Sequence, residues 1–175
     1  MSSFEIIQAD PTVRMPAGTY VVGDPCYAVP DSRWSEWLAL SDPAVFGPNP
    51  TRTDGGVSRV LIAELDGKPV LGIGTAHGDG LYPGTDGKRY PVDAGLIGLV
   101  PVEIAEGVRD DLSNIVTFDR PFECSYDEGV IKLGHISIQT EDEDDDEDYC
   151  RDCGDHYDWC RCDESELDDE EDEDD

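Results

Sequence analysis

Four cysteines lie within 13 residues near the C-terminal end of the sequence. Cys150 and Cys153 form a Cys-x2-Cys pair, and Cys160 and Cys162 form a Cys-x-Cys pair after six intervening residues. Zinc takes four tetrahedral thiolate or imidazole ligands, and a tight Cys-x2-Cys turn aims two sulfurs at one point. The spacing therefore predicts a zinc knuckle over this stretch. His156 is an alternative ligand, because Cys-x-Cys is tighter than the common second pair.

The energetics of this stretch also favour a metal. Only Tyr149, Tyr157 and Trp159 are large enough to bury there, whereas zinc supplies about 10–16 kcal/mol of apparent folding free energy in small peptides. Four protein ligands leave no open position, so the expected Zn2+ is structural and not catalytic. Reduced or redox-active thiols in a disordered tail remain one alternative. A disulfide pair is another, although cytosolic thiols usually stay reduced.

Two runs of eight consecutive acidic residues flank the cysteines, at 141–148 and 168–175. Like charges at this density repel one another and usually form solvated tails. An extended chain advances about 3.3–3.6 Å per residue, close to the roughly 3.4 Å between phosphates of one DNA strand. We therefore expect a basic protein partner, reached by mimicry of a nucleic acid or by simple charge attraction. A tail that only aids solubility is the alternative.

Three other segments, at 23–27, 75–80 and 91–95, are polar where a β protein normally has only turn residues. They contain four candidate pocket residues: Asp24, His77, Asp79 and Asp93. A histidine beside carboxylates can titrate near neutral pH, so their convergence would make a small-ligand site or a metal-dependent hydrolase. Gly-Asp-Gly is also ordinary turn chemistry, and aspartate before proline commonly ends a strand. We assign no catalytic residue on this pattern.

The same segments carry a family resemblance. The motifs are Gly18-Thr-Tyr20, Gly23-Asp-Pro-Cys-Tyr27, Gly78-Asp-Gly80-x-Tyr82 and Tyr90-Pro-Val-Asp-Ala-Gly95. Together they resemble an uncharacterised domain-of-unknown-function family of small proteins from bacteriophage and bacterial genomes. The resemblance covers residues 17–104. It implies a phage-encoded or bacterial cytosolic protein, and it carries no activity with it.

The elements that must position these residues are mostly strands. Apolar or β-branched runs bounded by turn residues lie at 4–8, 18–23, 57–65, 68–74, 81–82, 90–92, 96–104, 115–118, 123–127 and 130–139. Asp66-Gly67 between two such runs predicts a tight hairpin, and Asp86-Gly87, between 81–82 and 90–92, is a second turn signal. His135, within the last run, is expected to be a strand residue and not a ligand.

One helix is expected over 31–40, capped by Asp31 or Ser32, with Trp34, Trp37 and Leu38 on one face. Residues 41–56 are rich in proline and glycine and are expected to form a loop. Together with the strands, this predicts a mainly β (α+β) fold. The expected form is an antiparallel sheet, arranged as a sandwich or a curled barrel with one helix.

The charge distribution divides the chain into unlike parts. Residues 141–175 hold 22 acidic residues and two arginines, a net charge of −20, whereas residues 1–140 hold 20 acidic and 10 basic residues. We expect a β-rich domain (1–140), an acidic linker (141–149), the zinc knuckle (150–162) and a disordered acidic tail (163–175).

Such a charge balance disfavours direct nucleic-acid binding and adsorption to anionic membranes, both of which need clustered Lys and Arg. The first 15 residues contain Glu5 and Asp10 and no apolar run of seven, so we expect no secretory signal and a cytoplasmic location, in the host cytosol if the protein is phage-encoded.

The leading function is a non-enzymatic binding protein that engages a basic host or phage protein. A small-ligand binder or hydrolase and a minor virion component are the alternatives.

Overall fold

The computed structural model describes residues 12–52, 54 and 56–141. The chain divides into two units, Met1–Glu141 and Asp142–Asp175, and the fold below is that of the first. The predicted zinc knuckle, acidic linker and acidic tail lie outside the described residues, apart from Glu141. The strand expected at 4–8 also lies outside them.

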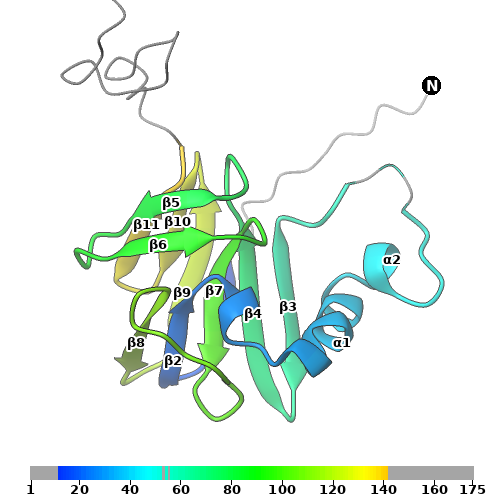
Figure 1. The fold of residues 1–175 in the computed structure, drawn as a ribbon, viewed down its shortest axis with the longest axis horizontal. Helices are drawn as coiled ribbons and strands as arrows, with labels where there is room; N and C mark the ends of the chain where they lie inside the picture. The colour runs from blue at the N-terminus through cyan, green and yellow to red at the C-terminus, as the bar shows by residue number, and fades with distance from the viewer. Residues whose placement is uncertain (1–11, 53, 55, 142–175) are drawn as a thin grey trace, which may run out of the picture. The chain divides into compact units, whose positions relative to one another are not determined.

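Strands dominate the described part of the chain (Figure 1). The elements in chain order are β1 (Val13–Met15), β2 (Gly18–Gly23), the short 3-10 turn η1 (Pro25–Tyr27), α1 (Asp31–Ser41), α2 (Pro43–Phe46), β3 (Val60–Leu65), β4 (Lys68–Gly74), β5 (Gly80–Pro83), β6 (Arg89–Val92), β7 (Leu96–Pro101), β8 (Ser113–Phe118), β9 (Phe122–Asp127), β10 (Val130–Leu133) and β11 (Ile136–Gln139).

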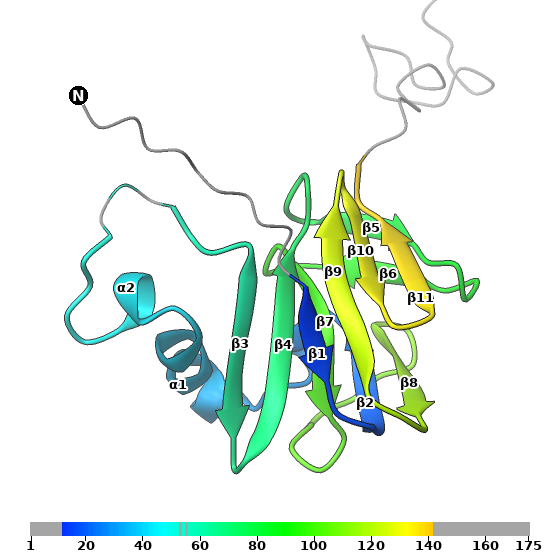
Figure 2. The same cartoon turned by 180° about the vertical axis from the view of Figure 1, so that it is seen from behind.

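The strands form two sheets and a separate β5-β6 ribbon. The larger sheet has the order β3-β4-β7-β2-β8 and the smaller one the order β1-β9-β10-β11, seen from behind in Figure 2. Every strand pair is antiparallel. Both sheets and the ribbon contribute side chains to one buried core, including Val22, Ile97, Tyr90 and Ile131. The mainly β antiparallel prediction is confirmed. None of the sheets in the described residues closes into a barrel, so that alternative is wrong.

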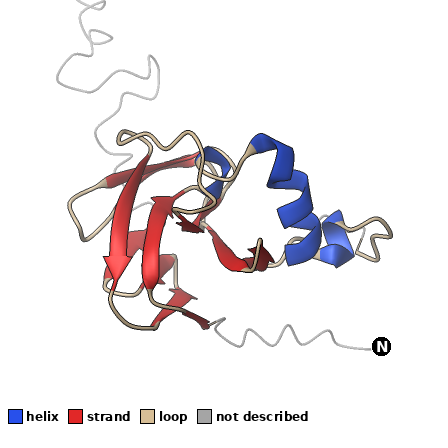
Figure 3. Cartoon of the chain, turned by 90° about the horizontal axis from the view of Figure 1, so that it is seen from below, coloured by secondary structure: helices blue, strands red, loops and turns tan. Residues whose placement is uncertain are grey.

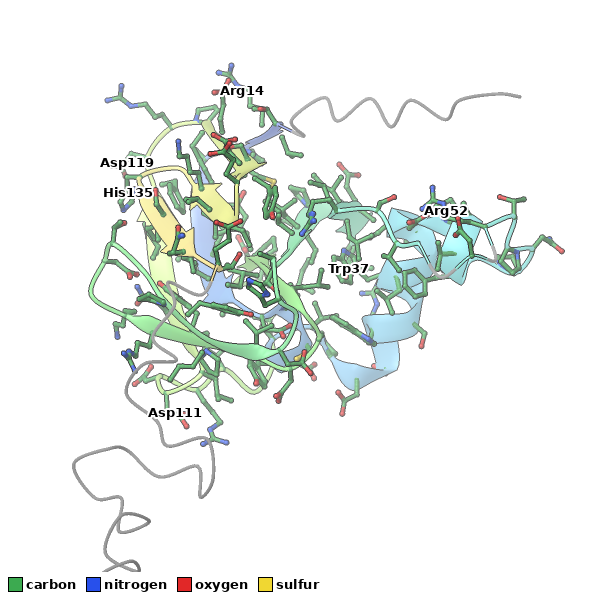
Figure 4. The ribbon with its side chains drawn as sticks, turned by 90° about the horizontal axis from the view of Figure 1, so that it is seen from above. Arg14, Trp37, Arg52, Asp111, Asp119 and His135 are labelled. Atoms are coloured by element: carbon green, nitrogen blue, oxygen red, sulfur yellow. The ribbon has the colours of Figure 1, made fainter. Side chains whose placement is uncertain are left out.

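A second core lies on the other face of the larger sheet, where the helices pack (Figure 3). Trp37 is fully buried there, and its indole N–H donates to the Val70 carbonyl at 3.1 Å. The labelled side chain lies between α1 and the sheet in Figure 4. The stretch 41–56, expected to form a loop, contains a second short helix, α2, so the prediction of a single helix is wrong. The helix predicted over 31–40 is confirmed as α1. Its cap prediction is wrong, because Pro30 takes the N-cap position and no side chain caps the helix.

Two facing glycines allow β4 to pack closely against β7 and against this indole. Gly72 of β4 and Gly98 of β7 are directly opposite each other in the sheet. A Cβ atom on Gly98 would lie 1.8 Å from the Leu71 carbonyl oxygen, and one on Gly72 would lie 2.9 Å from the Trp37 ring. Only glycine allows the strands and the indole to approach this closely.

The predicted Asp66-Gly67 hairpin is confirmed. Both turn residues have positive φ, 52° and 74°, as the tight hairpin requires. The run 130–139 was predicted as one strand and forms two, β10 and β11. Gly134, with φ of 62°, and His135 make the turn between them, so the strand placement of His135 is wrong. The His135 ring instead packs 5.3 Å from that of Phe118.

Thr140, directly after β11, fixes the end of the domain. Its side chain is fully buried. Its backbone N–H donates to the Gly129 carbonyl at 2.9 Å, and its hydroxyl accepts from the Ala76 N–H at 3.0 Å. The last strand is therefore joined both to the β9-β10 turn and to the loop after β4.

Candidate functional site

The three polar segments of the sequence are joined by hydrogen bonds of Asp24 and of the Thr75 backbone. One carboxylate oxygen of Asp24 accepts from the Cys26 N–H at 2.9 Å. The other accepts from the N–H groups of Asp93 and Ala94, at 2.9 and 2.7 Å. The Thr75 N–H donates to the Gly95 carbonyl at 3.0 Å. The end of β2, the loop after β4 and the loop before β7 therefore meet at one place.

Asp24 itself acts as a backbone cap. It is 1% exposed, and both of its oxygens accept from backbone donors, which compensates for burying the charge. Asp24 begins the turn η1 and holds the 93–94 loop against it. Both carboxylate oxygens are therefore used to bind backbone N–H groups of the fold.

The other three candidate residues lie on the surface. His77, Asp79 and Asp93 are all exposed. Asp93 lies beside Tyr27, whose pKa is raised first by burial and then by its interaction with Asp93. Across the described residues, no three His, Cys, Asp or Glu side chains are grouped to hold a metal ion. The structure thus brings the three segments together without assembling the four side chains into such a group.

The two solitary cysteines are protonated at neutral pH. Burial, followed by the negative charge of Asp24, raises the pKa of the half-buried Cys26 to about 12. Burial raises the pKa of Cys124, in the sheet core, to about 12 as well. Because the thiolate is the reactive form, neither thiol is an activated nucleophile.

A partly open pocket of about 430 Å³ lies beside this loop cluster. It is bounded by α1, α2, the chain leading into β3, the end of β4 and residues 94–96. Its apolar wall consists of Trp34, Leu38, Phe46, Val57, Leu61 and Leu96. The volume falls within the range of small-molecule sites.

The sequence did not reveal this pocket, because its wall is assembled from segments distant in the chain. One signal was present, since Phe46 and Val57 are large apolar residues in or beside a stretch that otherwise reads as loop. In the fold they are 37% and 48% exposed. Both line the pocket.

Arg59 lies at the pocket with its guanidinium held in place. One terminal nitrogen, Nη1, donates to the carbonyls of Gly74 and Thr75 at 3.1 and 2.9 Å. The guanidinium carbon lies 4.2 Å from the centre of the Tyr126 ring, in cation–π contact. The position of this positive charge is therefore set by β4 and β9.

A comparison of the chain with protein-family models found no match, and comparisons with curated proteins and with solved structures found none. The resemblance to a phage and bacterial family stays a prediction. Within the described part of the chain, no helix has the length and apolar character needed to cross a membrane.

Proposed function

We propose that this chain is a non-enzymatic binding protein that engages a basic protein through residues 141–175. The observation that carries the proposal is the segregation of charge. This segment has a net charge of −20 over 35 residues, and the remaining 140 residues have a net charge of −10. Concentrated charge attracts an oppositely charged partner over a distance and speeds its association.

The chemistry of the β domain supports binding over catalysis. Asp24 stabilises backbone, and the pKa of Cys26 and of Cys124 is far above neutral pH. A hydrolase built on Asp24, His77, Asp79 and Asp93 would need the Asp24 carboxylate for a metal or a proton, so we do not propose it.

A structural Zn2+ is part of the proposal. Cys150, Cys153, Cys160 and Cys162 would be its ligands, with His156 as the alternative to one of the second pair. The metal would order the knuckle and present Tyr157 and Trp159 to the partner. Aromatic side chains of this kind are frequent anchors of protein interfaces.

The test is affinity capture from bacterial lysate with four baits: the full chain, residues 1–141, the full chain with residues 141–175 in scrambled order, and Cys150→Ser/Cys153→Ser. The full chain should retain a basic protein that 1–141 loses. The scrambled bait keeps the charge and should retain that protein more weakly, because it lacks the knuckle. Binding should weaken steeply from about 50 to 500 mM salt, because exposed charges are screened.

Metal content is measured on the same baits. The full chain should carry about one equivalent of zinc, as expected for one four-ligand site, and the double variant none. A Cys26→Ser variant is the matched control and should keep its zinc. Capture by 1–141 equal to that of the full chain, or binding insensitive to salt, would contradict the proposed function. Zinc retained by the double variant would exclude these ligands.

A further inference from the structure

The pocket beside the loop cluster combines an exposed apolar wall with one fixed positive charge. Six large apolar residues of the described chain are strongly exposed, and Phe46 and Val57 are two of them. Both belong to the same wall, next to Trp34 and Leu38. Apolar surface gathered in a concave site, and not scattered singly, is typical of a binding site.

Arg59 lines the pocket, and some of its donors have no hydrogen-bond partner among the described residues. An arginine has five N–H groups, and the two on Nη1 already donate to Gly74 and Thr75. The N–H groups of Nε and Nη2 form the edge that binds a carboxylate through two parallel hydrogen bonds. Among the described residues, Arg59 makes no ion pair with a carboxylate, whereas Arg33, Arg52 and Arg109 each do.

The acids near the pocket do not neutralise this charge. The Asp42 carboxylate accepts from the N–H of the lining residue Ser58 at 3.0 Å and from Arg52 at 3.2 Å, so it is already paired. Asp93 precedes the lining residue Ala94 and interacts with Tyr27. Arg59 therefore remains a positive group beside apolar surface in a domain with twice as many acidic as basic residues.

We propose that this pocket binds a small amphipathic carboxylate, with its aromatic or aliphatic part against Trp34, Phe46 and Val57 and its carboxylate on Arg59. The pocket volume of about 430 Å³ admits such a molecule. The site is separate from residues 141–175. Its failure would leave the function proposed above intact, and failure of that function would leave this site intact.

The probes are 2-naphthoate and the uncharged 2-naphthylmethanol, titrated into the full chain by calorimetry. The two share one ring system and differ in the group that Arg59 would bind. We expect naphthoate to bind roughly ten-fold more tightly, the effect of one good charge-assisted contact. Arg59→Gln should bring the two affinities within about two-fold of each other. Arg89→Gln, which removes an exposed charge outside the pocket, should change neither.

A second variant tests the pocket without altering Arg59, which also supports the end of β4. Ala94 is exposed and lines the pocket, so Ala94→Phe should fill the volume and abolish binding of both probes. Leu40→Phe is the control, because Leu40 is exposed on α1 outside the lining. Thermal melts of each variant report on the fold.

Three results would overturn the proposal. The acid and the alcohol could bind equally, Ala94→Phe could leave binding unchanged, or naphthoate could fail to bind the full chain. If naphthoate binds only a full-length Phe4→Ser/Ile6→Ser/Ile7→Ser variant, the pocket's occupant is the N-terminal segment of this chain. That result also contradicts a small-molecule site.

Discussion

Asp24 illustrates how a single carboxylate can hold two segments of backbone together, its own turn at Cys26 and the loop at 93–94. It accepts three backbone hydrogen bonds while 1% exposed. Asp24→Asn replaces one accepting oxygen with an NH2 group that faces a backbone N–H. We expect the free energy of unfolding to fall by about 2–3 kcal/mol, because a buried donor loses its acceptor. Urea denaturation measures the loss.

Asp79→Asn is the matched control for this residue. Asp79 is exposed, and a surface change of this kind should shift stability by less than about 0.5 kcal/mol. Equal effects of the two substitutions would show that the hydrogen bonds of Asp24 do not stabilise the fold.

At this scale the sequence identified segments that meet in the fold, but not the backbone groups that Asp24 binds. Asp24 and Asp93 do belong to neighbouring loops, as their polar context suggested. Which group the Asp24 carboxylate binds depends on where the Asp93 and Ala94 N–H groups point in the folded loop, and a residue pattern does not contain that direction. The role of Arg59 depends in the same way on Tyr126, 67 positions later in the chain.

The contact between β4 and β7 depends on two facing glycines and the Trp37 ring. A Cβ atom on Gly98 would lie 1.8 Å from the Leu71 carbonyl oxygen. Gly98→Ala should therefore force the central strands apart and lower the free energy of unfolding by about 3 kcal/mol or more. The loss is measured by urea denaturation, or by the soluble yield if the variant aggregates.

Gly74→Ala in β4 provides the comparison. Its added Cβ would have no neighbour closer than 3.5 Å, so the cost should stay below about 1 kcal/mol. If Gly98→Ala is equally mild, the glycine pair is not needed for the strand approach.

The sequence predicted those turns and strands whose conformation depends on neighbouring residues in the chain. The Asp66-Gly67 turn has the positive φ angles that its residue types favour. The Gly134-His135 turn was missed, although glycine with positive φ is common at the first position of a two-residue hairpin turn. The packing of this turn on Phe118 is not visible in the sequence. The three residues of β1 were missed too, since their strand character comes from pairing with β9.

For the molecule as a whole, Thr140 determines where the folded domain can be cut. Residues 1–141 should keep the stability of the full chain within about 1 kcal/mol at an ionic strength of about 0.15 M, where distant charges are screened. Residues 1–139 should lose about 2–4 kcal/mol, because the Ala76 N–H and the Gly129 carbonyl lose their partner. Thermal and urea unfolding of the three chains would measure this. Two truncations of equal stability would contradict the role given to Thr140.

The attachment of the acidic segment has a mechanical consequence. Strand β11 is hydrogen bonded to β10 along one edge. On its other edge, Ser137 exchanges two hydrogen bonds with Thr85. Directly after the strand, Thr140 is hydrogen bonded to Gly129 and Ala76. A partner that pulls on the segment along the direction of β11 loads these bonds in parallel, because they run across the strand. Because the force is shared among these bonds, several of them must break together before β11 detaches. The domain is therefore expected to resist unfolding when residues 142–175 are pulled.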